Sequence, residues 1–151
     1  MVAAASVSAM TLTIDNARTI LSAAFAKRID AGINPLAIIV LDAGGHLVAF
    51  EREDGVPYGR FEVAHGKAAG ALAVGVNSRT LEVLAKDRPH FMTGVVGALN
   101  GAVVPVAGGV IVLDAEGNRI GAVGASGDTS DNDEIAVIAG IVAAGLVPSP
   151  K

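Results

Sequence analysis

Histidines supply the side chains best suited to acid–base or metal chemistry in this chain, which has three of them and no cysteine. His65 directly follows Ala64 on the apolar stripe of a predicted helix, so it is expected at the boundary between core and solvent. A histidine in that position could act as a general base or bind a metal or haem iron. The competing interpretation is a structural histidine that is hydrogen-bonded to a neighbouring carbonyl. Lys67 is expected on another, solvent-exposed face of the same helix.

A glycine-rich segment, residues 121–130, is the second candidate for chemistry. It has glycine at 121, 124 and 127 and is predicted to lead from a strand into a helix. Free backbone amides at a helix N-terminus bind anions, which would suit a carboxylate or a haem propionate. Nearby acids argue against phosphate, and the competing interpretation is that the glycines allow close packing while the acids cap the helix. The candidates are Ser126, Gly127, Thr129 and Ser130 for ligand binding and Asp128 for catalysis.

Two further polar residues could belong to a ligand pocket. Arg52 lies in a charged turn, and if it points inward it supplies the cation that a carboxylate ligand needs. His90 follows Pro89 at the predicted end of a helix, where a cationic side chain stabilises the helix dipole. The glycine-rich residues 94–101 are predicted to form a loop beside His90, which keeps this histidine as a second candidate.

The composition excludes several classes of protein. The 151 residues are 52% hydrophobic, 3% aromatic and 17% charged, and the net charge is −4. The chain therefore has neither the basic stripe nor the stacking aromatics that nucleic-acid binding requires. Without cysteine it can form no disulfide, thiolate nucleophile or Cys-ligated metal site.

One apolar stretch raises the question of membrane insertion. Residues 91–113 carry no charge and are long enough to span a bilayer, but five glycines, Asn100 and Pro105 interrupt them. We therefore expect no transmembrane helix. Residues 1–10 are predicted to be a disordered extension before a single domain at residues 11–148. The short leader has no positive region typical of a secretory signal, which favours a cytoplasmic protein.

An internal repeat organises the chain. Residues 39–48 reappear as residues 111–120, with an Asp-Ala-x-Gly segment at the same place in each copy. Each copy has the pattern of a β-hairpin, in which Gly45 and Gly117 supply the positive φ that the turn requires. His46, just after the first turn, is expected in solvent.

Apolar residues at three- and four-residue spacing predict four helices around these hairpins. The expected order is α-ββ-αα-βββ-α. Helices on both faces of one antiparallel sheet of about five strands give an α+β fold with three layers. The helices are expected to begin after Thr13, to cover Tyr58–Val76, to run from Ser78 to before Pro89, and to begin at Thr129 or Ser130.

Short motifs along the chain match one protein family in the expected order. They are Asp-Ala-Gly-Gly-His-Leu-Val at 42–48, Gly-Lys-Ala at 66–68, Pro-Val-Ala-Gly-Gly-Val at 105–110, Val-Gly-Ala-Ser-Gly at 123–127 and Asp-Glu at 133–134. With them the sequence resembles the GlcG/HbpS family, which includes the C-terminal domain of PduO-type proteins. The resemblance implies a profilin-like α/β/α domain, homo-oligomers up to octamers and, for some members, haem binding or breakdown.

The sequence departs from this family pattern, and three functions stay open. The first predicted helix has no histidine, so the axial haem ligand expected there in the PduO-like branch is missing. The first function is a haem- or tetrapyrrole-binding oligomer, with His65 or His90 near the iron and Arg52 or the 126–130 amides on the propionates. The second is a catabolic lyase, isomerase or hydrolase for a carboxylated metabolite, with His65 as general base. The third is a ligand-free assembly or regulatory module.

The apolar excess bears on the oligomeric state. A chain of this size cannot cover all of its apolar residues within one domain, and the last predicted helix is apolar around much of its circumference from residue 135 to 147. Subunit interfaces explain the surplus, since small side chains allow close approach. We therefore predict a multimer.

Overall fold

Helices and strands account for most of the described residues, 11–150, in a computed structural model of the protein. The extension predicted at residues 1–10 lies outside the described residues. The elements are α1 (Ile14–Asp30), β1 (Ala37–Asp42), β2 (Leu47–Arg52), α2 (Arg60–Val74), α3 (Ser78–Asp87), α4 (Pro89–Ala98), β3 (Gly109–Leu113), β4 (Arg119–Ser126), α5 (Ser130–Ala143) and β5 (Val147–Pro148).

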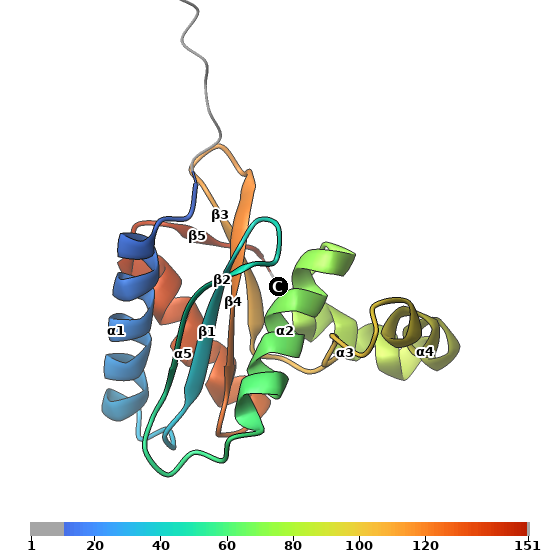
Figure 1. The fold of residues 1–151 in the computed structure, drawn as a ribbon, viewed down its shortest axis with the longest axis horizontal. Coiled ribbons are helices and arrows are strands. Elements are labelled where there is room, and N and C mark those ends of the chain that lie inside the picture. The colour runs from blue at the N-terminus through green and yellow to red at the C-terminus, as the bar shows by residue number, and fades with distance from the viewer. Residues whose placement is uncertain (1–10, 151) are drawn as a thin grey trace, which may run out of the picture.

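A five-stranded antiparallel sheet forms the middle layer, with strand order β2-β1-β4-β3-β5. Helices α1 and α5 cover one face of this sheet and α2 covers the other (Figure 1). The α+β prediction, with about five antiparallel strands and helices on both faces, is confirmed. None of the helices within residues 11–150 is long and apolar enough to cross a membrane.

Side-chain alternation along the strands explains the two apolar layers. In β1, Ile38 and Val40 pack in the core beneath α1 and α5, whereas Ile39 and Leu41 pack in the core beneath α2. All four side chains are fully buried. A strand covered by helices on both faces is expected to be apolar without interruption, as β1 is.

The two hairpins of the repeat are β1–β2 and β3–β4. The Asp42 carboxylate accepts hydrogen bonds from the amides of Gly44 (3.0 Å) and His46 (2.9 Å), which fixes the first turn. Asp114 holds the amides two and four residues further on in the same way, at 3.0 and 2.8 Å. The repeated aspartate is therefore a turn residue. His46 is exposed, as predicted.

The glycines of β4 allow α2 and β1 to approach closely. A Cβ on Gly124 would overlap the carbonyl oxygen of Ala64 in α2, and a Cβ on Gly121 would overlap that of Leu41 in β1. These contacts support the interpretation that the regularly spaced glycines at 121 and 124 allow close packing. Only glycine leaves room for two backbones at this separation.

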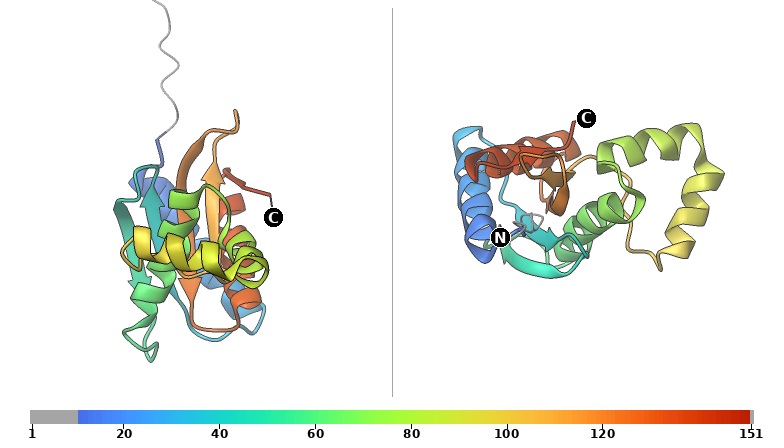
Figure 2. Two further views of the ribbon diagram at one scale, coloured as in Figure 1. Left: turned by 90° about the vertical axis from the view of Figure 1, so that its right-hand side faces the viewer. Right: turned by 90° about the horizontal axis from the view of Figure 1, so that it is seen from above.

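Two predictions about element order are wrong. Residues 94–101 were expected as a loop, but α4 covers residues 89–98 because Pro89 begins a new helix and Met92 packs beside Leu81 of α3. Three strands were expected before the last helix, but the fifth strand, β5, follows α5 and pairs with β3. Helices α3 and α4 project from the body beyond α2 (Figure 2).

Candidate functional site

His65 lies on the flank of α2 that faces β2. Its ring stacks on Phe61, with centroids 6.0 Å apart and an interplanar angle of 15°. Phe61 in turn makes an edge contact with Phe50 of β2, at 4.8 Å between centroids. The imidazole is half-buried and forms no hydrogen bond to any residue in the range 11–150. The expected bond to a neighbouring carbonyl is therefore absent, which leaves both ring nitrogens available.

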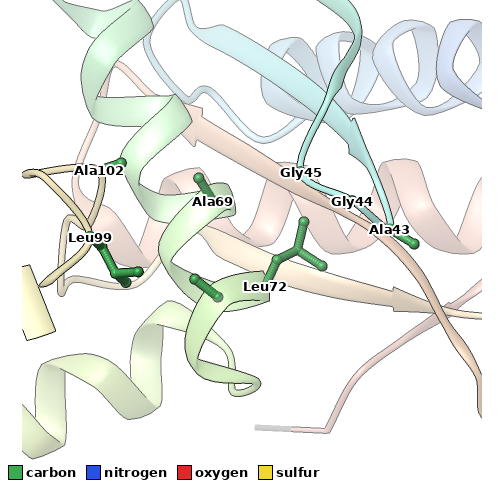
Figure 3. A pocket seen from close by; sticks show the side chains of 8 residues that line it. Ala43, Gly44, Gly45, Ala69, Leu72, Leu99 and Ala102 are labelled. Carbon is green, nitrogen blue, oxygen red and sulfur yellow. The ribbon is translucent and has the colours of Figure 1, made fainter.

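An apolar depression begins one helical turn beyond His65. Its floor is the outer surface of α2, and its sides are the β1–β2 turn and the segment after α4 (Figure 3). Leu72 and Leu99 project into this space, which has a volume of about 270 Å³. The lining residues are all aliphatic or glycine: Ala43, Gly44, Gly45, Ala69, Leu72, Ala73, Leu99 and Ala102.

The prediction that Lys67 is exposed to solvent is wrong, because this residue is only 2% exposed. Its Nζ donates to Oδ2 of Asp133 at 2.9 Å and to the carbonyl of Ala125 at 3.0 Å. Gly108 leaves the space that the ammonium group fills. Burial raises the pKa of Asp133, and the charge of Lys67 opposes this rise. The pair joins α2 to the start of α5.

Carboxylates of Asp128 and Asp133 occupy two of the amides that were candidates for anion binding, those of Thr129 and Asp128. Asp128 accepts hydrogen bonds from the amides of Asn34 (2.7 Å) and Thr129 (2.6 Å). The Asp128 amide donates to Asp133 at 3.0 Å, and the Thr129 side chain caps α5 by accepting from the amide of Asn132 at 3.2 Å. The hydrogen bonds that the Asp128 carboxylate accepts, led by that from the Asn34 amide, lower its pKa. Asp128 and Thr129 therefore hold the loop in place.

Ser126 and Gly127 face a different cation from the one considered from sequence. The hydroxyl of Ser126 is buried and accepts from Nη1 of Arg60 at 3.2 Å. Arg60 and Gly127 line a cavity of about 240 Å³ between loops. Sequence reasoning missed Arg60 as a site residue. The available signal was the position of Arg60 at the start of α2, because this helix packs on β4, which ends at Ser126.

Arg52 and His90 line neither cavity. Arg52 is exposed, and its Nη1 donates to the carbonyl of Val56 at 2.7 Å. His90 is exposed as the second residue of α4. The expected stabilisation of a helix dipole by His90 is therefore wrong, since a positive charge is unfavourable at a helix N-terminus. Ser130 is half-buried in the first turn of α5 and lines neither cavity.

The structure thus separates the sequence candidates. His65 adjoins the apolar depression, Ser126 and Gly127 adjoin the Arg60 cavity, and Asp128 is held by backbone amides. No group of three or more His, Asp or Glu side chains suited to a metal ion occurs within residues 11–150.

Comparisons with known proteins agree with this architecture. A crystal structure of a PduOC:heme complex has a TM-score of 0.82 and 23% identity, covering 91% of this chain and 98% of that chain. The Klebsiella pneumoniae protein ORFY, a DUF336 protein, has a TM-score of 0.82 and 20% identity, and the match covers 96% of this chain and 98% of that chain. HbpS has a TM-score of 0.75 and 22% identity, covering 94% and 96%.

Sequence comparison supplies the family. No curated protein sequence matches this chain. The model of the family described as haem degrading protein HbpS-like matches residues 12–142, which is most of the chain. This protein therefore belongs to the haem degrading protein HbpS-like family.

Proposed function

We propose that this protein binds haem, or a related tetrapyrrole, on the His65 flank of α2 and does so as a homo-oligomer. The observation that carries the proposal is the half-buried imidazole, which has no hydrogen-bonding partner within residues 11–150 and lies beside an apolar depression. Family membership and the likeness to a PduOC:heme complex support the same ligand.

The residues on this flank fit a haem group. A neutral imidazole is a common metal ligand, and stacking on Phe61 restricts the orientation of the His65 ring. The aliphatic and glycine residues beyond it offer an apolar surface without charge, which suits the apolar face of a macrocycle. Bound haem would supply an iron centre for redox or ligand chemistry. His65 would hold that iron, and Ala69 and Leu72 would contact the ring.

A single subunit provides only the floor and two sides of a site for such a ligand. The depression, about 270 Å³, is smaller than the range of about 300–1,000 Å³ usual for ligand pockets. A second subunit would supply the opposite wall and exclude water. None of the lining residues is charged, so the propionates would extend toward solvent or toward that second subunit.

Exposed apolar side chains support the oligomer. Ile135 and Val142 of α5 are 45% and 56% exposed, and they line a groove together with Ile138 of α5 and Lys27 of α1. Such a surface is typical of a protein interface. An assembly of up to eight subunits is the size that the family resemblance implies. Light scattering coupled to size exclusion measures it directly, and a stable monomer would refute this part of the proposal.

Hemin titration tests the ligand. We expect a saturable shift of the Soret band in the parent protein, loss of that shift in His65→Ala, and no change in His90→Ala. His90 is a matched control because it is exposed on α4 and lines neither cavity. Circular dichroism checks that each variant folds. Absence of a saturable shift in the parent, or an unchanged titration of His65→Ala, would overturn the assignment.

The catabolic-enzyme alternative has less support. It needs His65 as a base close to a carboxylate site with Arg52, but Arg52 donates to the carbonyl of Val56 and Asp128 is held by backbone amides. A ligand-free assembly module is the outcome that a negative hemin titration of a multimeric protein would favour.

A further inference from the structure

We propose that the cavity around Arg60 binds a small monocarboxylate that carries a hydroxyl or ammonium group, such as a short hydroxy or amino acid. The cavity has a volume of about 240 Å³ and lies near the start of α2. Three connections form its walls: the residues before β1, the β2–α2 loop and the β4–α5 loop.

Within residues 11–150, Arg60 differs from the other half-buried arginines and from the buried Lys67. Arg28 pairs with Glu53, Lys67 with Asp133, and Arg79 with Asp131 and Glu134. Arg60 is half-buried as well, yet no carboxylate within residues 11–150 lies within ion-pair distance of it.

The one hydrogen bond of the Arg60 guanidinium, to the hydroxyl of Ser126 at 3.2 Å, uses a neutral acceptor and leaves most of its five N–H donors free. A guanidinium fork matches the two oxygens of a carboxylate, and such charge-assisted pairs are stronger than neutral hydrogen bonds. The buried hydroxyl orients the fork at the cavity wall. A carboxylate is therefore the group that this cavity is best suited to bind.

Charged side chains hold the walls of the cavity rigid. Glu53 accepts hydrogen bonds from Arg28 and from the amide of Leu36, at 2.9 and 2.6 Å, which ties the loop after β2 to the start of β1. Arg52 fixes the carbonyl of Val56 in the same loop, at 2.7 Å.

The remaining wall is fixed by Asp128, which holds the amide of Asn34 at 2.7 Å and so ties the β4–α5 loop to the segment before β1. Three loops without regular structure are thus fixed around an open space. Such preorganisation reduces the entropy cost of binding a small ligand. Arg52 and Asp128, both candidates for direct chemistry from sequence, act here as positioning residues.

Asp54 sets the second requirement on the ligand. It lines the same cavity, and no ion pair joins its carboxylate to Arg60. A ligand with two negative charges would be repelled by this carboxylate. A hydroxyl or ammonium group can instead donate a hydrogen bond to it. The combination of Arg60 and Asp54 therefore selects a monocarboxylate that also carries a hydrogen-bond donor.

This cavity is separate from the proposed haem surface. His65 follows Arg60 by five residues, which corresponds to a net rotation of about 140° around the helix axis. The two side chains therefore point to different sides of α2. They also line no common cavity. Binding at one site can therefore be lost while binding at the other is retained.

Calorimetric titration with four compounds of one carbon skeleton tests the proposal. We expect lactate or alanine to bind saturably with one site per chain, propionate to bind at least about fivefold more weakly, and lactamide not to bind. Lactate and alanine distinguish a hydroxyl from an ammonium donor. Equal binding of lactamide and lactate, or no saturable binding of either lactate or alanine, would overturn the proposal.

Variants locate the binding in the Arg60 cavity. Arg60→Gln is expected to weaken the binding of the preferred compound at least about tenfold, and Asp54→Asn to remove its advantage over propionate. Arg88→Gln is the matched control, because Arg88 is exposed and its guanidinium lies over the Phe91 ring of α4, away from the residues that line this cavity. Unchanged binding in Arg60→Gln would refute the assignment. Hemin titration of Arg60→Gln should match the parent, which separates this test from that of the haem proposal.

Discussion

The buried ion pair of Lys67 and Asp133 gives a sharp test of how this fold is held together. Both side chains are 2% exposed, and the pair is 2.9 Å apart. Lys67→Met keeps an unbranched side chain of nearly the same length but leaves Asp133 buried without its cation. Removal of one partner from a buried pair typically costs about 3–5 kcal/mol of unfolding free energy.

The lower part of that range applies here. Asp133 keeps the hydrogen bond from the amide of Asp128, at 3.0 Å, and it can take up a proton. We therefore expect Lys67→Met to lose about 3 kcal/mol in urea unfolding at neutral pH and at fixed protomer concentration. The control is Arg18→Met, since Arg18 and Asp15 form a pair that is 72% and 89% exposed. That variant should lose less than about 1 kcal/mol.

The pH dependence of this penalty distinguishes a lost charge pair from lost packing. Burial already raises the pKa of Asp133 above 3.8, and Lys67 opposes the rise, so removing Lys67 raises this pKa further. The folded variant then keeps a proton that the unfolded chain has released. Its unfolding free energy consequently falls as pH rises above 3.8. The difference between parent and variant should therefore grow from acidic to neutral pH.

The double variant Lys67→Met/Asp133→Asn completes the cycle. It contains no uncompensated charge, so it should recover most of the stability lost in the single variant. A penalty below about 1 kcal/mol for Lys67→Met, or a penalty that is constant with pH, would refute the reasoning. So would a double variant whose loss equals the sum of the two single losses.

Two further predictions concern the packing and the loops. Gly124→Ala should lower the unfolding free energy by more than about 2 kcal/mol, because the added Cβ would overlap the carbonyl oxygen of Ala64. The control is Gly94→Ala in α4, where an added Cβ would meet no atom within 4 Å. This variant should be neutral or stabilising by up to about 1 kcal/mol. Asp128→Ala should lower the unfolding free energy by about 1 kcal/mol at neutral pH, because the hydrogen bond from the Asn34 amide is lost. Since the pKa of Asp128 is lowered in the folded protein, the stabilities of parent and variant should converge as pH falls below 3.8. A difference that stays constant with pH would contradict this role.

The sequence predicted most elements of the fold because their signals are local. Thr13 caps α1 in a capping box, and Thr129 caps α5, both as expected from residue type. The paired hairpins were predicted by the Asp-Ala-x-Gly repeat, in which Gly45 and Gly117 have φ of 81° and 84°. These features depend on residues within a few positions of one another, so a single sequence contains them.

The errors concern features set by distant residues. Lys67 was expected in solvent, because a charged residue on an alanine-rich helix is usually exposed, but Asp133 pairs with it from 66 residues away. The glycines of residues 94–101 were predicted to form a loop, although α4 packs on α3 through Met92. His90 was therefore assigned to the wrong end of a helix. No local pattern specifies such contacts.

The candidate site was only partly predictable for the same reason. His65 was found from its position beside an apolar stripe, and Ser126 and Gly127 from the glycine period. Arg60 was missed because the bond to Ser126 joins residues 66 positions apart. Arg52 carries the positive charge that a carboxylate ligand needs and lies next to the loop that lines the Arg60 cavity. Its side chain does not line this cavity, however, and instead donates a hydrogen bond to the carbonyl of Val56 in that loop.

The scarcity of aromatic side chains and the abundance of glycine have one structural explanation. Gly109 and Gly124 bring β3 and β4 so close to α2 that a Cβ at either position would overlap the carbonyl oxygens of Lys67 and Ala64. An α2 helix seated this closely on β3 and β4 leaves no room for a side chain at residue 109 or 124, and the larger side chains beneath it, Ile39 and Leu41, come from β1. The remaining aromatic contact, Phe50 with Phe61, lies at the edge of the helix and extends to His65. Close packing of α2 on β3 and β4 thus leaves both proposed binding surfaces at the margins of this face, where a ligand or a second subunit can reach them.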